Sequence, residues 1–316
     1  MIDFRYHLIS IIAVFLALGL GVLMGSVVLD DQFVKHLENQ VDAFDQRNDE
    51  LQEQIDALEA QVEASQAYAV QSAPWLLEDQ LEGRSVVVIE LEGIDGGTVS
   101  ELRSTIEEAG GAVPTTITLT ERFALPGEVE RDQLALAIDS TASTPRDIRI
   151  EAATMLGDRI SAAAVEAITS NRPRSDAQQR LGTLLQDLQD TEFVAVDGTP
   201  DVAVVPSGAL FLFVGGTAEG PGYDPAPMSV GLVSAMSERG SPVLAAEPLD
   251  SDWGLVSAIR DDGEASARVS TVDQAGAIEG RIAVVLGLRQ QFEGTTDHYG
   301  VAEGATKVIP EPSTSD

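Results

Sequence analysis

Cysteine is absent from this chain of 316 residues. Its absence excludes disulfide bonds, thiolate catalysis and metal sites built from cysteine. Histidine occurs three times and the five methionines show no Met-x-x-Met spacing, so ligands for a selective copper site are scarce. The chain also lacks a Gly-x-Ser-x-Gly elbow, a His-Glu-x-x-His motif and the common glycine-rich nucleotide motifs. We therefore expect no enzymatic activity and no resident cofactor.

Positive charge is also scarce. The chain has 19 lysine and arginine residues against 52 acidic ones, which gives a formal net charge of −33. Such a surface repels nucleic acid and anionic lipid headgroups. We expect no nucleic-acid partner, and most of the carboxylates are expected to form a well-solvated surface.

One long apolar run stands near the amino terminus. Leu8 to Leu29 carries no charge and only two serines as polar side chains. A helix of this length extends roughly 33 Å, enough to cross about 30 Å of hydrocarbon. Arg5 and His7 precede the run and two aspartates follow it, so the positive-inside rule predicts a single-pass cell-membrane protein with residues 1–7 cytoplasmic and the rest extracytoplasmic. A cleaved signal peptide is the alternative, but its apolar region would be shorter and would end in small residues.

Two glycines in this run have a spacing that is typical of helix contacts in membranes. Gly21 and Gly25 form a Gly-x-x-x-Gly pair, which lets two helix backbones approach closely. The alternative is that both are ordinary glycines of a membrane helix.

A heptad pattern follows over residues 30–73. Apolar side chains recur at alternating steps of three and four from Val34 onward, which predicts a coiled-coil stalk. Asn48 occupies an a position, where a buried asparagine favours two parallel strands. We expect a parallel homodimer; the alternatives are pairing with a helix of another protein and packing onto the chain's own domain. The other residues of this seam are Leu37, Val41, Phe44, Leu51, Ile55, Leu58 and Val62.

Residues 74–300 are predicted to form one α/β domain. Pro74 is expected to stop the stalk helix, and short β-branched runs then alternate with helical patterns. This alternation predicts a mainly parallel sheet of Rossmann-like or flavodoxin-like order covered by helices, with a helical insert at about 121–190. Residues 301–316 are expected to be a disordered tail. The predicted strands are Ser85–Leu91, Thr115–Thr120, Phe193–Val196, Ala209–Val214, Val243–Ala246 and Arg268–Val272, and the clearest helices are Thr98–Ala109, Ile148–Ile168, Ala177–Leu188, Met228–Glu238 and Asp273–Phe292.

The candidate sites are few. The loops Gly93–Thr98 and Gly215–Tyr223 leave the carboxyl ends of predicted strands, where open α/β sheets bind ligands, but ordinary tight turns explain them. Acidic pairs such as Asp261 and Asp262 are expected to cap helices. The metal candidates are His298, which follows Asp297, and His36, which a parallel dimer would bring near its copy.

Both ends of the chain resemble one family. The opening Asp3-Phe-Arg-Tyr-His-Leu-Ile-Ser10 and the closing motifs Ser270-Thr-Val-Asp273, Gly280-Arg281 and His298-Tyr299-Gly300 are similar to those of actinobacterial membrane proteins of the MctB family. The resemblance implies a role in copper transport or homeostasis in the cell envelope, with copper as a transported or sensed ion. Some members have been described as outer-membrane channels. Other relatives are connected to cell-division complexes that control peptidoglycan hydrolases through coiled-coil contacts.

Two functions therefore remain open. The first is copper transport or homeostasis by a membrane-anchored envelope protein. The second is a non-enzymatic dimeric scaffold whose stalk and α/β head bind cell-wall or division proteins. Tight copper binding that is lost on His298→Ala would support the first, and capture of a coiled-coil protein would support the second.

Overall fold

The computed structural model describes residues 4–169, 176–198, 205–216 and 222–311, with side chains described for all of these except 26–34 and 166–169. The chain divides into two compact units, residues 1–65 and 66–316. Each unit is treated by itself below. The second unit contains the whole sheet and is called the head.

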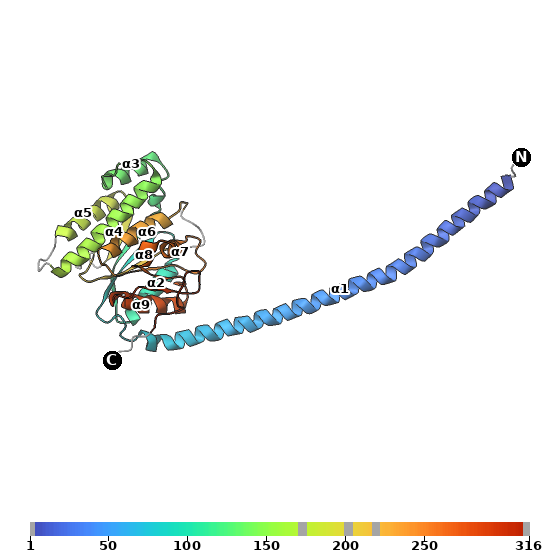
Figure 1. Cartoon of the computed structure of the whole chain (residues 1–316), viewed down its shortest axis with the longest axis horizontal. Coiled ribbons are helices and arrows are strands. Elements are labelled where there is room, and N and C mark those ends of the chain that lie inside the picture. The colour runs from blue at the N-terminus through green and yellow to red at the C-terminus, as the bar shows by residue number, and fades with distance from the viewer. Residues whose placement is uncertain (1–3, 170–175, 199–204, 217–221, 312–316) are drawn as a thin grey trace. The chain divides into compact units, whose positions relative to one another are not determined.

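Helix α1 spans Phe4–Leu77 and is drawn from blue to cyan in Figure 1. The predicted stop at Pro74 is wrong, because the helix continues for three more residues with Pro74 inside it. A proline there removes one backbone hydrogen bond. The last turns are nevertheless held in the head, since Ala69, Ala73 and Leu77 are all buried in its core. The spacing of these three residues, four apart, places them on one helix face.

The predicted mainly parallel sheet is confirmed. It has seven strands in the order β3-β2-β1-β4-β5-β6-β7, and every pair is parallel except β2 with β3. The first six positions follow the Rossmann order rather than the flavodoxin order, with β3 reversed. The strands are β1 Ser85–Leu91, β2 Ala112–Leu119, β3 Val194–Gly198, β4 Leu210–Val214, β5 Val243–Ala246, β6 Ser270–Val272 and β7 His298–Tyr299.

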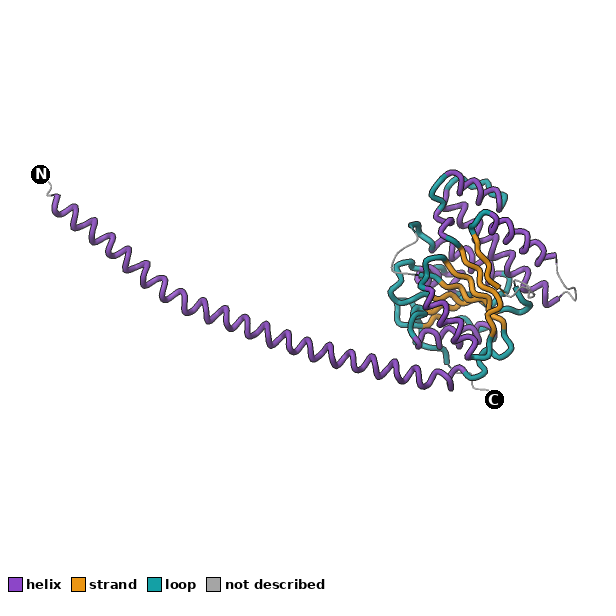
Figure 2. The backbone as a smooth tube through the Cα atoms, turned by 180° about the vertical axis from the view of Figure 1, so that it is seen from behind, coloured by secondary structure: helices purple, strands orange, loops and turns teal. Residues whose placement is uncertain are grey.

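Helices cover both faces of the sheet, which Figure 2 shows in orange between purple helices. One face is covered by the end of α1 together with α2 and α9, and the other by α3 to α8. The predicted helical insert between β2 and β3 contains η1, α3, α4 and α5. The bounds are α2 Gly96–Glu108, η1 Glu121–Ala124, α3 Glu128–Ala137, α4 Pro145–Thr169, α5 Asp176–Asp190, α6 Ala226–Glu238, α7 Leu255–Asp261, α8 Gly263–Ser266 and α9 Ile278–Phe292.

Alternate side chains of the central strands point to the two helical layers. Val86 and Val88 of β1 pack toward α2 and α9, whereas Val87 and Ile89 pack toward the layer that contains α4 and α6. All four are nearly inaccessible to solvent. A strand buried on both faces reads as a continuous apolar run, which is why Ser85–Leu91 was predicted with the bounds that the structure has.

Several predicted bounds differ from the structure by a few residues, and the largest difference among the strands and helices of the head is at the start of α9. The predicted helix 273–292 begins only at Ile278, because the backbone N–H groups of Asp273 and Ala275 donate to Tyr299 and Glu247 and so belong to the strand ends. Gly276 therefore precedes the helix. Gly280 lies on it, so close to Gln274 that a side chain would overlap the backbone, which explains why glycine is required there.

The predicted tail 301–316 is ordered over its first part. The N–H of Gly300 donates to Lys307, Thr306 donates back to His298, and Pro310 is buried. These bonds form a return turn beside β7. Residues 312–316 lie outside the described part of the chain.

Candidate functional site

The amino-terminal part of α1 carries a span that could cross a membrane. It covers Phe4–Gly25 with a mean hydropathy of 2.6, and none of it is buried within the described structure. The predicted run began and ended slightly later, at Leu8 and Leu29. A continuous apolar surface of this size requires a lipid or apolar protein environment. One apolar helix of this length is compatible with membrane anchoring.

The predicted heptad seam is exposed in the single chain. Its seven described apolar residues are between 44% and 76% accessible, the lowest being Leu37 and the highest Phe44. Asn48 is exposed among them, while the side chain of Val34 is outside the described set. By contrast, the buried apolar residues of the head are at most 8% accessible. A helix whose apolar stripe is exposed to solvent is poorly stabilised alone. Burial of this stripe against another surface would stabilise it.

The two glycines of the span have open surroundings. No described atom lies within 4 Å of the position that a side-chain carbon would occupy at Gly21 or Gly25. Within one chain, therefore, no contact requires glycine at these positions. Helix pairing through them stays a prediction.

His36 lies on the exposed surface of α1, four residues before Gln40, and the ring nitrogen Nε2 of His36 is 3.3 Å from the Gln40 amide nitrogen. No carboxylate or second imidazole joins it among the described residues, which contain no group of three or more His, Asp and Glu side chains able to hold a metal ion.

His298 has partners at its ring within the head. Its Nδ1 is 2.9 Å from the Thr271 hydroxyl, and the ring also hydrogen-bonds the backbone of Ser266. Burial and the nearby Arg260 guanidinium lower the pKa of His298. A metal ion could bind the ring only by displacing one of these bonds.

The neighbouring carboxylate is equally engaged. Asp297 accepts hydrogen bonds from the His298 N–H at 3.0 Å and from the Thr306 hydroxyl, and Lys307 lies 3.2 Å away. Burial opposes its ionisation, but the hydrogen bonds from Thr306, His298 and Lys307 prevail and lower the pKa of Asp297. The Asp297 carboxylate thus stabilises the turn that follows β7, whereas the His298 ring joins β7 to Thr271 and Ser266.

A buried ion pair that sequence reasoning missed organises this end of the sheet. The side chains of Arg260 and Asp273 are each 4% accessible, and Nη1 of the arginine is 2.9 Å from the carboxylate. Arg260 also donates to the Thr271 hydroxyl and to the carbonyls of Tyr299 and Glu303. Each of the three nitrogens of this desolvated guanidinium group therefore donates at least one hydrogen bond, and these bonds join α7 to β6, β7 and the closing turn. The only sequence signal was Asp273 in the resembled motif.

The same aspartate also fixes the closing turn. It accepts the N–H groups of Val301 at 2.9 Å and Ala302 at 3.1 Å. Gly300 has a φ of +128°, and a side chain there would run into the Asp273 carboxylate. This explains why glycine follows the His-Tyr pair of the closing motif.

The loops at the carboxyl ends of the strands are occupied by internal contacts. Glu247, buried after β5, accepts the N–H groups of Leu255 and Val256 at 3.0 and 3.1 Å; burial raises the pKa of Glu247, and these bonds only partly oppose the effect. Asp95 caps α2 by accepting the N–H of Thr98 at 3.1 Å. The first glycine loop therefore forms the predicted turn, but the helix begins at Gly96 and Asp95 caps it.

Two further loop predictions have different outcomes. Residues 217–221 of the loop Gly215–Tyr223 lie outside the described part of the chain. The capping role expected for Asp262 is confirmed, since its carboxylate accepts the N–H groups of Glu264 and Ala265 at the start of α8.

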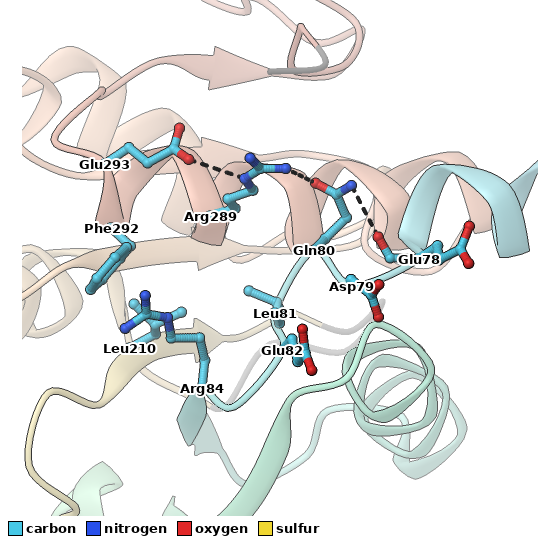
Figure 3. Close-up of a pocket in the computed structure, with 10 residues that line it drawn as sticks. All are labelled: Glu78, Asp79, Gln80, Leu81, Glu82, Arg84, Leu210, Arg289, Phe292 and Glu293. Carbon is cyan, nitrogen blue, oxygen red and sulfur yellow. Dashed lines mark hydrogen bonds and ion pairs between the residues drawn. The ribbon is translucent and has the colours of Figure 1, made fainter. Parts of the chain in front are cut away.

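A cavity of about 390 Å³ lies at the amino ends of strands β1 and β4, between the turn after α1 and helix α9 (Figure 3). The Arg84 guanidinium stacks on the Phe292 ring, 3.7 Å from its centre. Arg289 donates to Glu293 at 3.1 Å and to Gln80. Sequence reasoning missed this site, because its residues come from segments about two hundred positions apart.

Comparison with known proteins gives one consistent result. Residues 1–310 match the family described as "Copper transport outer membrane protein, MctB". The chain is 28% identical over 313 residues to the copper transporter MctB of Mycobacterium tuberculosis, covering 98% of this chain and 99% of that protein. It is 32% identical over 329 residues to the copper transporter MctB of Mycobacterium leprae, covering 98% and 100%.

Proposed function

Because the chain belongs to the MctB family, we propose that it acts in copper transport or homeostasis as a membrane-anchored envelope protein that works as a parallel homodimer. The relatives in Mycobacterium are named as copper transporters. The observation that supports the membrane-anchored homodimer is the uncovered apolar seam of α1, which follows a span apolar enough to cross a membrane.

The proposed orientation places the head outside the cell membrane. Arg5 and His7 precede the span and Asp30 and Asp31 follow it, so the amino terminus is proposed to be cytoplasmic. Two copies anchored in one membrane in this way run parallel. The membrane and a second copy are the first proposed partners, and no nucleic acid is expected because the charge is −33.

The charges that flank the seam support a parallel pair. In such a pair each g residue faces an e residue of the second copy. In two of the three pairs given below a glutamine faces an acidic residue, and in the third an arginine faces a glutamine. No two like charges therefore face each other. In an antiparallel pair the e positions, mostly acidic, would face one another and repel. The parallel g to e pairs are Gln40 with Asp45, Arg47 with Gln52 and Gln54 with Glu59.

The pairing segment is proposed to end near Ser65. The next a position of the heptad is Ala69, which is 5% accessible and belongs to the head of its own chain. A residue already covered by its own head has no surface left for a partner. The proposed dimer seam therefore covers the segment 34–65.

The proposed copper role works through the assembly and involves no catalytic step. The described residues of one chain contain no cluster able to hold a metal ion, and His298 and Asp297 already have hydrogen-bond partners. We therefore assign the copper effect to paired chains in the envelope, with copper as the transported or sensed ion.

A deletion strain tests this function. Complementation with the wild-type gene should restore normal copper content, and the variant Ile55→Asp/Leu58→Asp, which breaks the seam, should fail at equal protein level. A matched variant on the outer face of the same helix, Glu53→Ala/Asp56→Ala, should complement. Normal copper content with the seam variant would contradict the proposal, and His298→Ala in the same assay tests the predicted ligand.

A second function is favoured by the same seam and by a groove in the helical insert. The groove, of about 600 Å³, lies among α3, α4 and α5 and is lined by residues that include Met155, Leu184, Arg159 and Arg180. Mixed apolar and charged surfaces of this kind suit protein contacts. The chain would then be a scaffold for cell-wall or division proteins, including regulators of peptidoglycan hydrolases. Septation defects with normal copper content in the deletion strain would select this function.

A further inference from the structure

The cavity beneath α9 has a composition that is unusual for so acidic a chain. Two arginines, Arg84 and Arg289, line it together with the exposed edge of Phe292 and the acidic turn 78–82. All of these residues belong to the head. We propose that this cavity binds a short peptide with free termini, taking the carboxylate at its arginine side and the ammonium at its acidic side. The proposal is independent of chain pairing and of copper.

Arg84 is prepared to accept a carboxylate. Its backbone is fixed at the start of β1, where its N–H donates to Leu81 and its carbonyl accepts from Ala112. The face of its guanidinium group is stacked on Phe292, which restricts the side chain and leaves its N–H edge available. Among the described residues, no side chain forms an ion pair with Arg84. Such a planar, oriented donor edge is suited to bidentate binding of a carboxylate.

Arg289 supplies a second positive group that is already held in place. Its Nε donates to Glu293, and one Nη donates to Gln80, which in turn donates to the carbonyl of Glu78 at 3.3 Å. Figure 3 shows this row of side chains along α9. These bonds leave the other Nη without a recorded partner among the described residues. The row therefore orients a positive group without consuming all its donors.

The acidic side of the cavity is the turn after α1. Its carboxylates belong to Glu78, Asp79 and Glu82, all exposed, and none forms an ion pair with a described residue. In Figure 3 Asp79 and Glu82 lie to one side of Leu81, while Arg84 and Phe292 lie to the other. The unpaired carboxylates thus lie on one side of the cavity and Arg84 on the other, while the remaining carboxylate of the lining, Glu293, is paired with Arg289.

The overall charge favours a zwitterion over a simple anion. A chain with a net charge of −33 repels anions before they reach two arginines. A molecule that carries both charges is not repelled, and it can satisfy the guanidinium and the carboxylate groups at once. The volume of about 390 Å³ is at the lower end of the range for small-molecule sites, which suits a dipeptide.

Isothermal titration of the full-length chain in detergent micelles tests the proposal. The probe is alanyl-alanine, compared with N-acetyl-alanyl-alanine, which keeps only the carboxylate, and with alanyl-alanine amide, which keeps only the ammonium. The zwitterion should bind. Each blocked peptide should bind at least about tenfold more weakly, since it loses one charge-assisted contact. Absence of binding by the zwitterion, or equal binding by a blocked peptide, would overturn the proposal.

Variants separate the two ends of the site. Arg84→Gln should weaken binding of alanyl-alanine about tenfold or more, whereas Arg146→Gln, an exposed arginine of α4 outside the cavity, should leave it unchanged. The triple variant Glu78→Gln/Asp79→Asn/Glu82→Gln should remove the preference for the zwitterion over the N-acetyl peptide. Unchanged binding by Arg84→Gln overturns the assignment, and thermal melting verifies that each variant is folded.

Discussion

The two units of this chain use their apolar residues in opposite ways. In the head, strand residues such as Phe211 and Phe213 are fully buried, and the sheet is covered on both faces by helices of the same chain. In the segment 4–65, Phe15 and Phe44 are 69% and 76% accessible. The head therefore obtains its stability from internal packing, whereas the helix exposes apolar side chains that the proposed membrane and second copy would cover.

This difference teaches where function should be sought. A buried apolar residue is explained by the fold, but a regular exposed stripe is explained only by something outside the chain. Buried polar side chains of the head form hydrogen bonds within the head, as the bonds of Arg260 and Glu247 illustrate. Among the described residues, the span, the seam and the cavity beneath α9 are three surfaces that the fold itself does not explain.

Phe213→Ala should give the largest difference in stability between the two units. Truncation of this fully buried ring in β4 should lower the free energy of unfolding of the head by about 3–5 kcal/mol. Urea unfolding followed by far-ultraviolet circular dichroism measures the change. The matched change Phe44→Ala in the seam should leave the unfolding midpoint of the head where it is. Equal losses from the two substitutions would mean that the units are not energetically distinct.

Arg260→Met should have the next largest effect. It leaves the buried carboxylate of Asp273 without its cation, which should cost about 3 kcal/mol of head stability. The control is Arg268→Met, whose pair with Glu238 is exposed and 3.6 Å long and should change stability by less than about 1 kcal/mol. Chemical denaturation measures both. A small loss from Arg260→Met would show that the strand ends do not depend on this pair.

Asn48→Val tests the seam with a smaller change. Removing a buried amide from the a position should tighten self-association by about 1–3 kcal/mol and relax the preference for two strands. Sedimentation equilibrium in detergent gives the association constant and the number of chains. Asp49→Ala, one residue later and off the seam, should change neither quantity. Weaker association of Asn48→Val would contradict the placement of Asn48 between helices.

His298→Gln should have the smallest effect, visible only through pH. The pKa of His298 is lowered from its ordinary value of 6.5, so the unfolded chain binds this proton more readily than the folded chain. The stability that depends on the neutral ring is present above pH 6.5 and is lost as the pH falls below it. Between pH 7 and 5 the melting temperature of the head should therefore fall less steeply in His298→Gln than in wild type. His36→Gln, which lies outside the head, is the control, and identical slopes in all three proteins would contradict this role of the ring.

The sequence predicted those features that depend on local pattern. The strands Ser85–Leu91 and Val243–Ala246 have the predicted bounds because each is a short apolar run buried on both faces. The long helix was also predicted, but its end was misplaced at Pro74. The cost of the proline is local, whereas the burial of Leu77 depends on the folded head.

Features that depend on distant contacts could not be predicted. The start of α9 is set by backbone bonds from 273–277 to Glu247 and Tyr299, which no local pattern reveals. The stacking of Arg84 on Phe292 likewise joins the two ends of the head. The role of His298 as a metal ligand stays a prediction, and its partners Thr271 and Ser266 became visible only in the fold.

Cysteine cross-linking in membranes tests the central claim most directly, because the natural chain has no cysteine. Single substitutions Val41→Cys and Val62→Cys place one thiol near each end of the seam, and Gln46→Cys places one on the outer face. A parallel pair in register should give disulfide-linked dimers with both seam variants and little with Gln46→Cys. Only single chains, or equal cross-linking at all three positions, would contradict the account.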